Sequence, residues 1–373
     1  MVEGIVPRVL SDPDGRFCVW NGDCRVVLSR LPDNCVDAVV TDPPYELGFM
    51  GKSWDSSGVA YDGLLWGEVL RVLKPGGHLL AFGGSRTYHR LACAVEDAGF
   101  EIRDQIMWVY GSGFPKSLNV SKAIDKAAGV KREVVGIRKV SPSDLGQASG
   151  WNALDTSSGR YEYTAATTDA AKQWDGWGTA LKPAHEPIVV ARKPFTGTVA
   201  QNVLELGTGA INIDGTRITL AEGDTSHAGN RTATFGTQQT QSGGDGSGGW
   251  EQAESRWPAN FIHDGSDEAT EPLREAARFF YCAKPSKAER NAGTNGNTHP
   301  TVKPITLMRY LCRLVTPPGG TVLDPFTGSG TTLAAALLEG FHAWGCEMTD
   351  DYLPIIEGRM AWAINETGNP TLF

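Results

Sequence analysis

Two short motifs, far apart in the chain, carry side chains suited to chemistry, and each follows an apolar run. The first is Asp42-Pro43-Pro44-Tyr45. Its prolines lack backbone N–H donors but keep their carbonyls as acceptors. A carboxylate beside such a carbonyl gives two acceptors suited to an exocyclic amino group, and the Tyr45 ring offers a face on which a flat base can stack. The alternative interpretation is a rigid exit from a strand into a loop.

The second motif, Asp324-Pro325-Phe326-Thr327-Gly328-Ser329-Gly330, is a glycine loop between a predicted strand and a predicted helix. Glycines let the backbone approach a ligand closely, and the N-terminus of the following helix favours an anionic group such as an amino-acid carboxylate. Glu347 ends the next predicted strand. An acidic side chain there can accept hydrogen bonds from both hydroxyls of a ribose. The loop and Glu347 together predict a nucleoside-cofactor site; the alternative interpretation is an ordinary tight turn.

The patterns that must position these motifs alternate between strand and helix on both sides of a long irregular segment. Before that segment we predict strands at 17–20, 36–40, 78–82 and 101–110 and helices at 24–31, 64–73 and 88–98. After it we predict strands at 321–323 and 342–346 and helices at 305–315, 331–338 and 352–363. This alternation indicates an α/β fold with a mostly parallel sheet covered on both faces. Both motifs then lie at the same edge of one sheet.

The irregular segment, residues 113–297, is rich in Gly, Ser, Thr and Asn, with strand-like pieces at 187–191 and 211–213. We interpret it as an inserted domain that separates the two parts of a catalytic domain, residues 1–112 and 298–373. Within it, 203–209 also has the letters of a cofactor loop. The residues that follow predict a strand and turn rather than a helix, so the anion site of a helix N-terminus is missing. We assign 203–209 to the insertion.

The charge of the chain is unevenly distributed. The net charge of −9 is unfavourable for a nucleic-acid-binding protein, yet segment 116–139 holds seven basic residues against two acidic ones, a local balance of +5. A local basic stretch can bind phosphates whatever the total charge of the protein. The alternative interpretation is a solvated helix face. The candidate phosphate contacts are Lys116, Lys122, Lys131 and Arg132.

The two motifs, together with His299-Pro300-Thr301-Val302-Lys303-Pro304 between them, resemble those of the amino-methylating DNA methyltransferases. These enzymes act on adenine N6 or cytosine N4. The resemblance is to the circularly permuted class in which the base-binding tetrapeptide precedes the cofactor loop, and it covers 17–112 and 299–363. It implies a Rossmann-like fold with a seven-stranded sheet, S-adenosyl-L-methionine as the cofactor, double-stranded DNA as the partner, and target recognition by the insertion.

The resemblance also implies roles for individual residues. The cofactor loop would wrap the methionine part, Asp324 would lie near its amino group, and Glu347 would hold the ribose. Lys303 would pair with the methionine carboxylate, and Asp23 would receive the adenine of the cofactor. The full set of implied cofactor-binding residues is Asp23, His299, Thr301, Lys303, Asp324, Pro325, Phe326, Gly328, Gly330, Thr331 and Glu347.

The mechanism implied by the resemblance needs no covalent intermediate. A base inside a duplex must be flipped into a pocket, where Asp42 and the Pro43 carbonyl would accept its amino hydrogens and Tyr45 would stack on it. Pro44 completes the predicted catalytic set. An Asp at the first position of the tetrapeptide favours N6 of adenine. Cytosine N4 methylation, RNA methylation and a catalytically silent DNA-binding module of the same fold remain alternatives.

Composition describes an ordinary globular protein, with 40% hydrophobic and 21% charged residues. No apolar run approaches the roughly 20 residues needed to cross a bilayer, and residues 1–15 lack the pattern of a signal peptide. The seven cysteines contain no CxxC pair, which argues against both a disulfide framework and a zinc site. We expect a cytoplasmic enzyme, bacterial or phage-encoded, without a metal or a membrane partner. A restriction-modification context and a homodimer are compatible with the resemblance.

Overall fold

The computed structural model describes residues 10–48, 53–111, 113, 117–139, 160–219, 255–283 and 287–367. Its centre is a ten-stranded sheet in the order β1-β2-β14-β13-β3-β4-β8-β5-β11-β12. In that order, the strands are β1 (Leu10–Ser11), β2 (Phe17–Asn21), β14 (His342–Glu347), β13 (Thr321–Asp324), β3 (Val36–Thr41), β4 (Leu73–Phe82), β8 (His185–Arg192), β5 (Glu101–Val109), β11 (Phe261–His263) and β12 (Tyr281–Cys282).

Most neighbouring strands of this sheet are parallel. The exceptions are β1, which is antiparallel to β2, and β8, which is antiparallel to both β4 and β5. The central run from β2 to β5 has the seven strands that the resemblance implied, but its β8 comes from the segment predicted as an insertion; β1, β11 and β12 extend the sheet at the two edges. The predicted α/β class and mostly parallel sheet are thereby confirmed.

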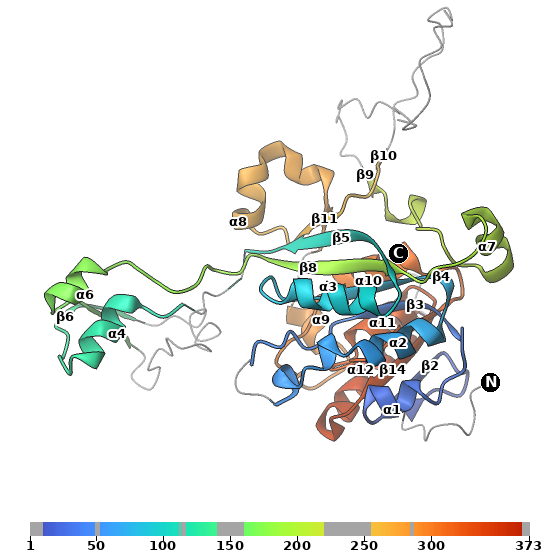
Figure 1. Cartoon of the computed structure of the whole chain (residues 1–373), viewed down its shortest axis with the longest axis horizontal. Helices are drawn as coiled ribbons and strands as arrows, with labels where there is room; N and C mark the ends of the chain where they lie inside the picture. Colours follow the sequence, from blue (N-terminus) through green and yellow to red (C-terminus); the bar gives the residue numbers. More distant parts are fainter. Residues whose placement is uncertain are drawn as a thin grey trace, which may run out of the picture.

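Helices cover both faces of the sheet (Figure 1). Adjacent residues of a strand point to opposite faces, so Val40 packs with one set of helices and Val39 with the other. The Val40 face carries α10 (Ile305–Val315), α11 (Thr331–Leu338) and α12 (Leu353–Thr367). The Val39 face carries α1 (Cys24–Leu28), α2 (Gly63–Val72) and α3 (Tyr88–Asp97). No helix of the described residues has the length and apolar character needed to cross a membrane.

A small arm projects from this body between β5 and β8 (Figure 1). It contains α4 (Val120–Ala127), β6 (Val134–Lys139), β7 (Arg160–Thr164) and α6 (Asp169–Gln173), with β6 and β7 paired antiparallel. Asp125 on α4 is buried and accepts hydrogen bonds from the backbone N–H groups of Thr167 and Thr168, so it ties α4 to the segment before α6. These hydrogen bonds hold the elements of the arm together.

Shorter elements lie around the sheet. They are η2 (Ser53–Ser56), η3 (Val59–Tyr61), α7 (Val199–Leu206), η5 (Asp214–Thr216), β9 (Ile218–Thr219), β10 (Ser255–Arg256), α8 (Asp267–Thr270), η6 (Glu271–Phe279), α9 (Lys287–Asn291) and η7 (Asp350–Tyr352). Residues 203–206 belong to the stretch 203–209 that has the letters of a cofactor loop, and they form the last turn of α7. Gly207 caps that helix with a left-handed φ of 76°. The predicted strand at 211–213 does not form.

The segment 113–297 does not stand apart from the catalytic sheet as one unit. Residues 185–192 form β8 inside the sheet, and 261–263 and 281–282 extend its edge. This placement was not predicted because the apolar pattern of 187–191 indicates a strand but does not indicate which sheet that strand joins. Among the described residues of this segment, the parts outside the sheet and its covering helices are the arm, the short elements at 199–219 and 255–256, and α8, η6 and α9.

Candidate functional site

A cavity of about 550 Å³ lies at the carboxyl edge of the parallel strands and is lined by both motifs. The motifs meet because β3 and β13 are adjacent and parallel, with Val39 paired with Leu323. The Thr41 hydroxyl, at the end of β3, donates to Asp324 Oδ1 at 2.6 Å. Carboxyl edges of parallel strands are where ligands of such sheets bind. The predicted convergence of the two motifs is therefore present in the structure.

The glycine loop turns from β13 into α11 through two left-handed glycines, Gly328 at φ 52° and Gly330 at φ 79°. A Cβ on Gly328 would lie 3.0 Å from His299 Nε2, and one on Gly330 would lie 3.4 Å from Ile356 on α12. Gly328 lines the cavity, whereas Gly330 packs the loop against α12. Gly328 therefore leaves space in the cavity beside His299, and Gly330 lets the loop pack closely against α12.

Two carboxylates at strand ends border the loop. Asp324 is 2% exposed, and its burial raises the pKa to about 6. Glu347 accepts backbone N–H groups from Gly328 at 2.8 Å and from Thr349 at 2.7 Å, while burial raises its pKa. Both line the cavity. Each carboxylate therefore organises the backbone around the loop as well as facing the space beside it.

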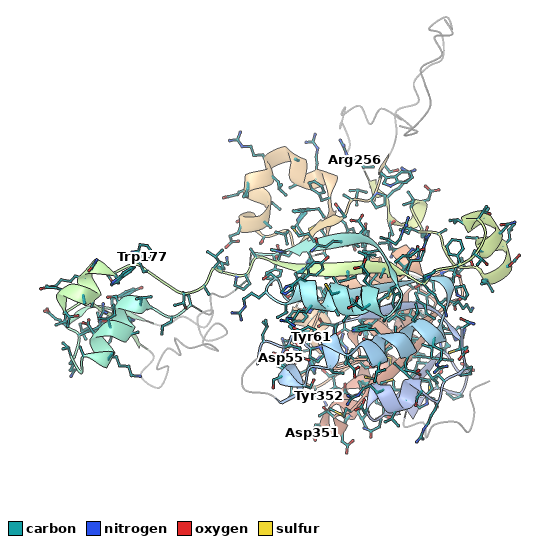
Figure 2. The ribbon with its side chains drawn as sticks, viewed as in Figure 1. Asp55, Tyr61, Trp177, Arg256, Asp351 and Tyr352 are labelled. Carbon is teal, nitrogen blue, oxygen red and sulfur yellow. The ribbon has the colours of Figure 1, made fainter. Side chains whose placement is uncertain are left out.

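His299 and Thr301 form the part of the cavity wall beside Gly328 of the loop. His299 Nδ1 lies 2.6 Å from the Thr301 carbonyl, and the ring packs edge-on against Tyr352 at 4.6 Å between centroids. Burial lowers the pKa of His299 to about 4, so the ring is neutral at pH 7. Figure 2 shows Tyr352 on the same lower side of the body as Asp55, and both residues line the cavity. The remaining predicted cofactor residues of this wall and loop that line the cavity are Pro325, Phe326 and Thr331.

Asp23 also lines the cavity, just after β2. It caps the N-terminus of α1 by accepting the backbone N–H of Arg25 at 2.9 Å. The Arg25 guanidinium binds the same carboxylate at 2.6 Å, and this pairing lowers the pKa of Asp23. Asp23 is therefore an ionised acceptor at the predicted position, with an arginine already bound to it.

The tetrapeptide forms the other end of the cavity, with Asp42, Pro43, Pro44 and Tyr45 all lining it. The Lys303 ammonium lies 2.7 Å from Asp42 Oδ2 and 3.1 Å from the Tyr45 hydroxyl. The sequence analysis placed this lysine at the carboxylate of the cofactor. In the structure its side chain extends to the tetrapeptide, where its ammonium forms an ion pair with Asp42.

Glu186 also lines the cavity, although it was not among the predicted site residues. Its Oε2 accepts the Tyr45 hydroxyl at 2.8 Å and lies 3.2 Å from Lys303 Nζ; its Oε1 accepts the Tyr110 hydroxyl at 3.3 Å. The signal was a charged residue at the start of the apolar run 187–191. Because β8 is antiparallel to its neighbours, its first residues lie at the carboxyl edge of the other strands, beside the motifs.

Asp55, a second residue that sequence reasoning missed, is 2% exposed and accepts the backbone N–H groups of Glu46 at 3.0 Å and Leu47 at 3.2 Å. It thereby holds the loop that follows Tyr45. The cavity wall between the tetrapeptide and the arm includes Trp108 and Tyr110 at the end of β5. Trp108 and Tyr110 therefore add two aromatic side chains to the cavity that the tetrapeptide lines.

The predicted phosphate contacts lie on the arm, away from the cavity, except Lys116, which is outside the described residues. Lys131 is exposed and Lys122 is half-buried. Arg132 turns inward: its side chain is 10% exposed, pairs with Asp125 at 3.3 Å and donates to the Ser121 hydroxyl at 3.0 Å. Arg132 is therefore a structural residue of the arm in this conformation.

Comparison with known proteins gives a consistent assignment. The family model of N6/N4 DNA methylases matches residues 36–358. The type II methyltransferase M.HindIII of Haemophilus influenzae is 22% identical over 387 positions, covering 92% of this chain and 94% of that protein. M.ScaI of Streptomyces caespitosus is 38% identical over 78 residues, covering 21% of this chain and 24% of that protein.

Solved structures of similar proteins include a putative DNA modification methylase from Thermus thermophilus complexed with S-adenosyl-L-methionine. It is 19% identical, with a TM-score of 0.44 and 93% of each chain covered. The cytosine-N4-specific PvuII DNA methyltransferase is 14% identical, with a TM-score of 0.47, covering 92% of this chain and 86% of the other. The assignment rests on the family model, which spans the tetrapeptide, the glycine loop and the segment between them. The chain belongs to the N6/N4 family of DNA methylases.

Proposed function

We propose that this chain is a site-specific methyltransferase that acts on the N6 amino group of adenine in double-stranded DNA. Methyl transfer to DNA amino groups follows from the family; the choice of adenine is the part proposed here, and Asp42 at the first position of the tetrapeptide supports it. The observation that carries the proposal is the single cavity lined by both the tetrapeptide and the glycine loop.

The residues at the loop end of the cavity fit S-adenosyl-L-methionine, the methyl donor of the family. Gly328 leaves room where a side chain would narrow the space beside His299. Glu347 and Asp23 are acceptors at the ends of neighbouring strands, suited to ribose hydroxyls and to an adenine amino group. When bound, the cofactor supplies an electrophilic methyl group on a positively charged sulfur.

The tetrapeptide end is suited to a flipped base. An exocyclic amino nitrogen is a poor nucleophile because its lone pair is delocalised into the ring. Asp42 and the Pro43 carbonyl accept its hydrogens and favour the tetrahedral nitrogen of the transition state. Tyr45 stacks on the base, and Asp42 is the nearest acceptor for the proton that the nitrogen loses after methylation. Positioning two reactants in one cavity supplies the remainder of the acceleration.

The arm is the proposed DNA contact outside the cavity, with Lys122 and Lys131 toward phosphates. Figure 2 shows Trp177 on this arm, far from the cavity residues Asp55 and Tyr352. Trp174 packs edge-on against Trp177 at 5.0 Å between centroids, and both rings are exposed. Exposed aromatic rings beside basic residues suit nucleic acid. Lys131→Glu should lower the salt dependence of DNA binding by about one unit of log–log slope; an unchanged slope would remove Lys131 from the interface.

The biological setting is proposed on the same ground. The type II relatives indicate a restriction-modification context, and we place the reaction in the cytoplasm of a bacterium or a phage-infected host. A homodimer remains a prediction, which sedimentation of the purified protein would test.

The decisive experiment is expression in a methylation-free host followed by modification-sensitive sequencing of its DNA. We expect N6-methyladenine at one sequence motif. N4-methylcytosine instead would contradict the adenine assignment and keep the class of enzyme. Asp42→Ala should retain cofactor binding, measured by calorimetry, and lose methylation; full methylation by this variant would overturn the role of the tetrapeptide. Absence of DNA methylation by the natural chain, with methylated RNA or no product, would overturn the function itself.

A further inference from the structure

The tetrapeptide end of the cavity contains a second carboxylate that no motif includes. Glu186 comes from β8, which runs opposite to its neighbours, and it reaches Tyr45, Lys303 and Tyr110. Its backbone is held on both sides: Tyr110 N–H donates to the Ala184 carbonyl at 3.0 Å and Gly83 N–H to the Pro187 carbonyl at 2.9 Å. The position of this carboxylate is therefore set by the sheet.

The cluster contains two carboxylates and one ammonium. The Lys303 side chain is 10% exposed, and its ammonium also lies 4.8 Å from the centre of the Phe82 ring. Although burial opposes the charged form, Asp42 and Glu186 raise the pKa of Lys303, so it stays an ammonium. Burial, with the charges of Asp42 and Glu186, raises the pKa of Tyr45, so its hydroxyl stays a donor. Two carboxylates beside one ammonium give the cluster a formal charge of −1.

These contacts leave one open acceptor. Lys303 occupies Oδ2 of Asp42, whereas Oδ1 is buried and has no hydrogen-bond partner among the described residues. A buried oxygen without a partner is costly unless a ligand satisfies it. The Tyr45 hydroxyl is likewise committed to Glu186, which restrains the ring at the cavity wall.

We propose that Glu186 is a positioning residue of the base site. It holds Lys303 and Tyr45 from the side opposite Asp42, so that Lys303 retains Oδ2, and Oδ1 remains directed to the incoming amino group. The inference rests on the proposed methyl transfer.

The net negative charge of the cluster serves the same reaction. An Asp42–Lys303 pair alone would be neutral, and a second carboxylate beside it costs free energy in a partly buried site. The amino nitrogen gains positive charge as its bond to the methyl group forms, and a nearby negative charge stabilises that change. Glu186 therefore contributes at the moment of transfer, when a merely structural ion pair would contribute nothing.

The test compares Glu186→Gln, which keeps the shape and removes the charge, with Glu186→Asp, which keeps the charge. Single-turnover methylation by Glu186→Gln should fall on the order of a hundredfold, as for a misplaced reacting group, with cofactor affinity within about twofold. Glu186→Asp should recover part of the rate. Fluorescence of 2-aminopurine at the target position should show that Glu186→Gln still flips the base but holds it in a more mobile state.

The matched control is Glu101→Gln, which removes the carboxylate of the Glu101–Arg192 pair at the opposite end of β5 and β8. This control should leave the rate unchanged. An active natural chain with an equally active Glu186→Gln variant would overturn the inference alone, as would equal losses of rate and cofactor affinity. A natural chain without methyl transfer to DNA would instead contradict the proposed function.

Discussion

The two ends of the cavity are built in different ways. The end with the glycine loop, where we propose that the cofactor binds, is called the cofactor end, and the end with the tetrapeptide, where we propose that the base binds, is called the base end. At the cofactor end, backbone N–H groups close in the sequence bind the carboxylates: Phe326 N–H donates to Asp324, which also accepts the Thr41 hydroxyl, and Thr349 N–H donates to Glu347. At the base end, side chains hold side chains, from the end of β3, the start of β8 and the segment before α10. Asp42, Glu186 and Lys303 are far apart in sequence and meet only in the fold.

This difference predicts different responses to mutation. A loop held by its own backbone depends on conformations that glycine permits, so it is sensitive to added atoms and tolerant of changes in distant side chains. A cluster of mutually paired side chains is sensitive to the loss of any one charge, because the remaining charges are left partly buried without compensation.

The largest effect should come from Lys303→Met. The variant leaves Asp42 and Glu186 facing each other, and we expect the methylation rate to fall by about a hundredfold or more because Asp42 loses its orientation. Unfolding free energy should fall by up to about 3 kcal/mol, less than for a fully buried pair because both acids are partly exposed. Single-turnover kinetics and denaturant titration measure the two effects.

Lys74→Met is the control for that variant. It breaks a comparable pair, Lys74 with Asp37 at 2.6 Å, between β4 and β3, at the opposite end of β3 from the tetrapeptide. We expect a loss of stability with no change in the methylation rate constant. Equal losses of rate in both variants would show that the base end has no special dependence on its lysine.

A smaller effect is expected at the cofactor end from Gly328→Ala. The backbone there is left-handed, and the new methyl group would press on His299. We expect the KM for S-adenosyl-L-methionine to rise about tenfold, equivalent to roughly 1.4 kcal/mol, with little change in kcat. Gly340 also has a left-handed φ, 79°, and a Cβ there would have nothing within 4 Å. Gly340→Ala should therefore lower stability through backbone strain, as Gly328→Ala does, but leave the KM for S-adenosyl-L-methionine unchanged. If the KM rose equally in both variants, backbone strain rather than the contact with His299 would explain the effect of Gly328→Ala.

The last effect is on stability rather than on the reaction, and it concerns the link between the two ends, where Thr41 binds Asp324. The pKa of Asp324 is raised to about 6 by burial, so the folded chain binds its proton more tightly than the unfolded chain does. The contribution of this residue to stability is therefore greatest below the unfolded pKa of 3.8 and is lost as the pH rises through 6.

Comparison with Asp324→Asn isolates that contribution. The difference in unfolding free energy should change by up to about 3 kcal/mol in favour of the asparagine variant between pH 4 and pH 7, then level off. Denaturant titrations at several pH values measure it. A difference that is constant with pH, or that favours the natural chain as the pH rises, would contradict the raised pKa.

The same contrast explains how much could be predicted from the sequence. The alternation of strands and helices and both motifs were predicted, because hydrophobic period and glycine loops are local properties. β3 was expected at 36–40 and forms at 36–41, and the helix after the glycine loop was expected and forms at 331–338. Local patterns of this kind therefore predicted the strand, the loop and the helix that form the cofactor end.

What could not be predicted depends on strand neighbours. The antiparallel direction of β8 brings Glu186 to the carboxyl edge, and no local pattern records that direction. The same holds for Lys303, whose reach toward Asp42 depends on where the segment before α10 crosses the sheet, and for Arg132, whose partner Asp125 is buried inside the arm. Tertiary pairing of charged groups decides these placements.

The hydrogen-bonded neighbours β5 and β8 have one more consequence. Val109 pairs with His185, so the long segment 111–183 leaves the body and returns to it at one point, as an oversized hairpin loop does. A loop whose two ends are already joined by a strand pair can change in length and content without altering the register of the strands beneath. Under the DNA contact proposed for the arm, a change in this one segment would alter what the enzyme binds while the paired strands β5 and β8 keep their register.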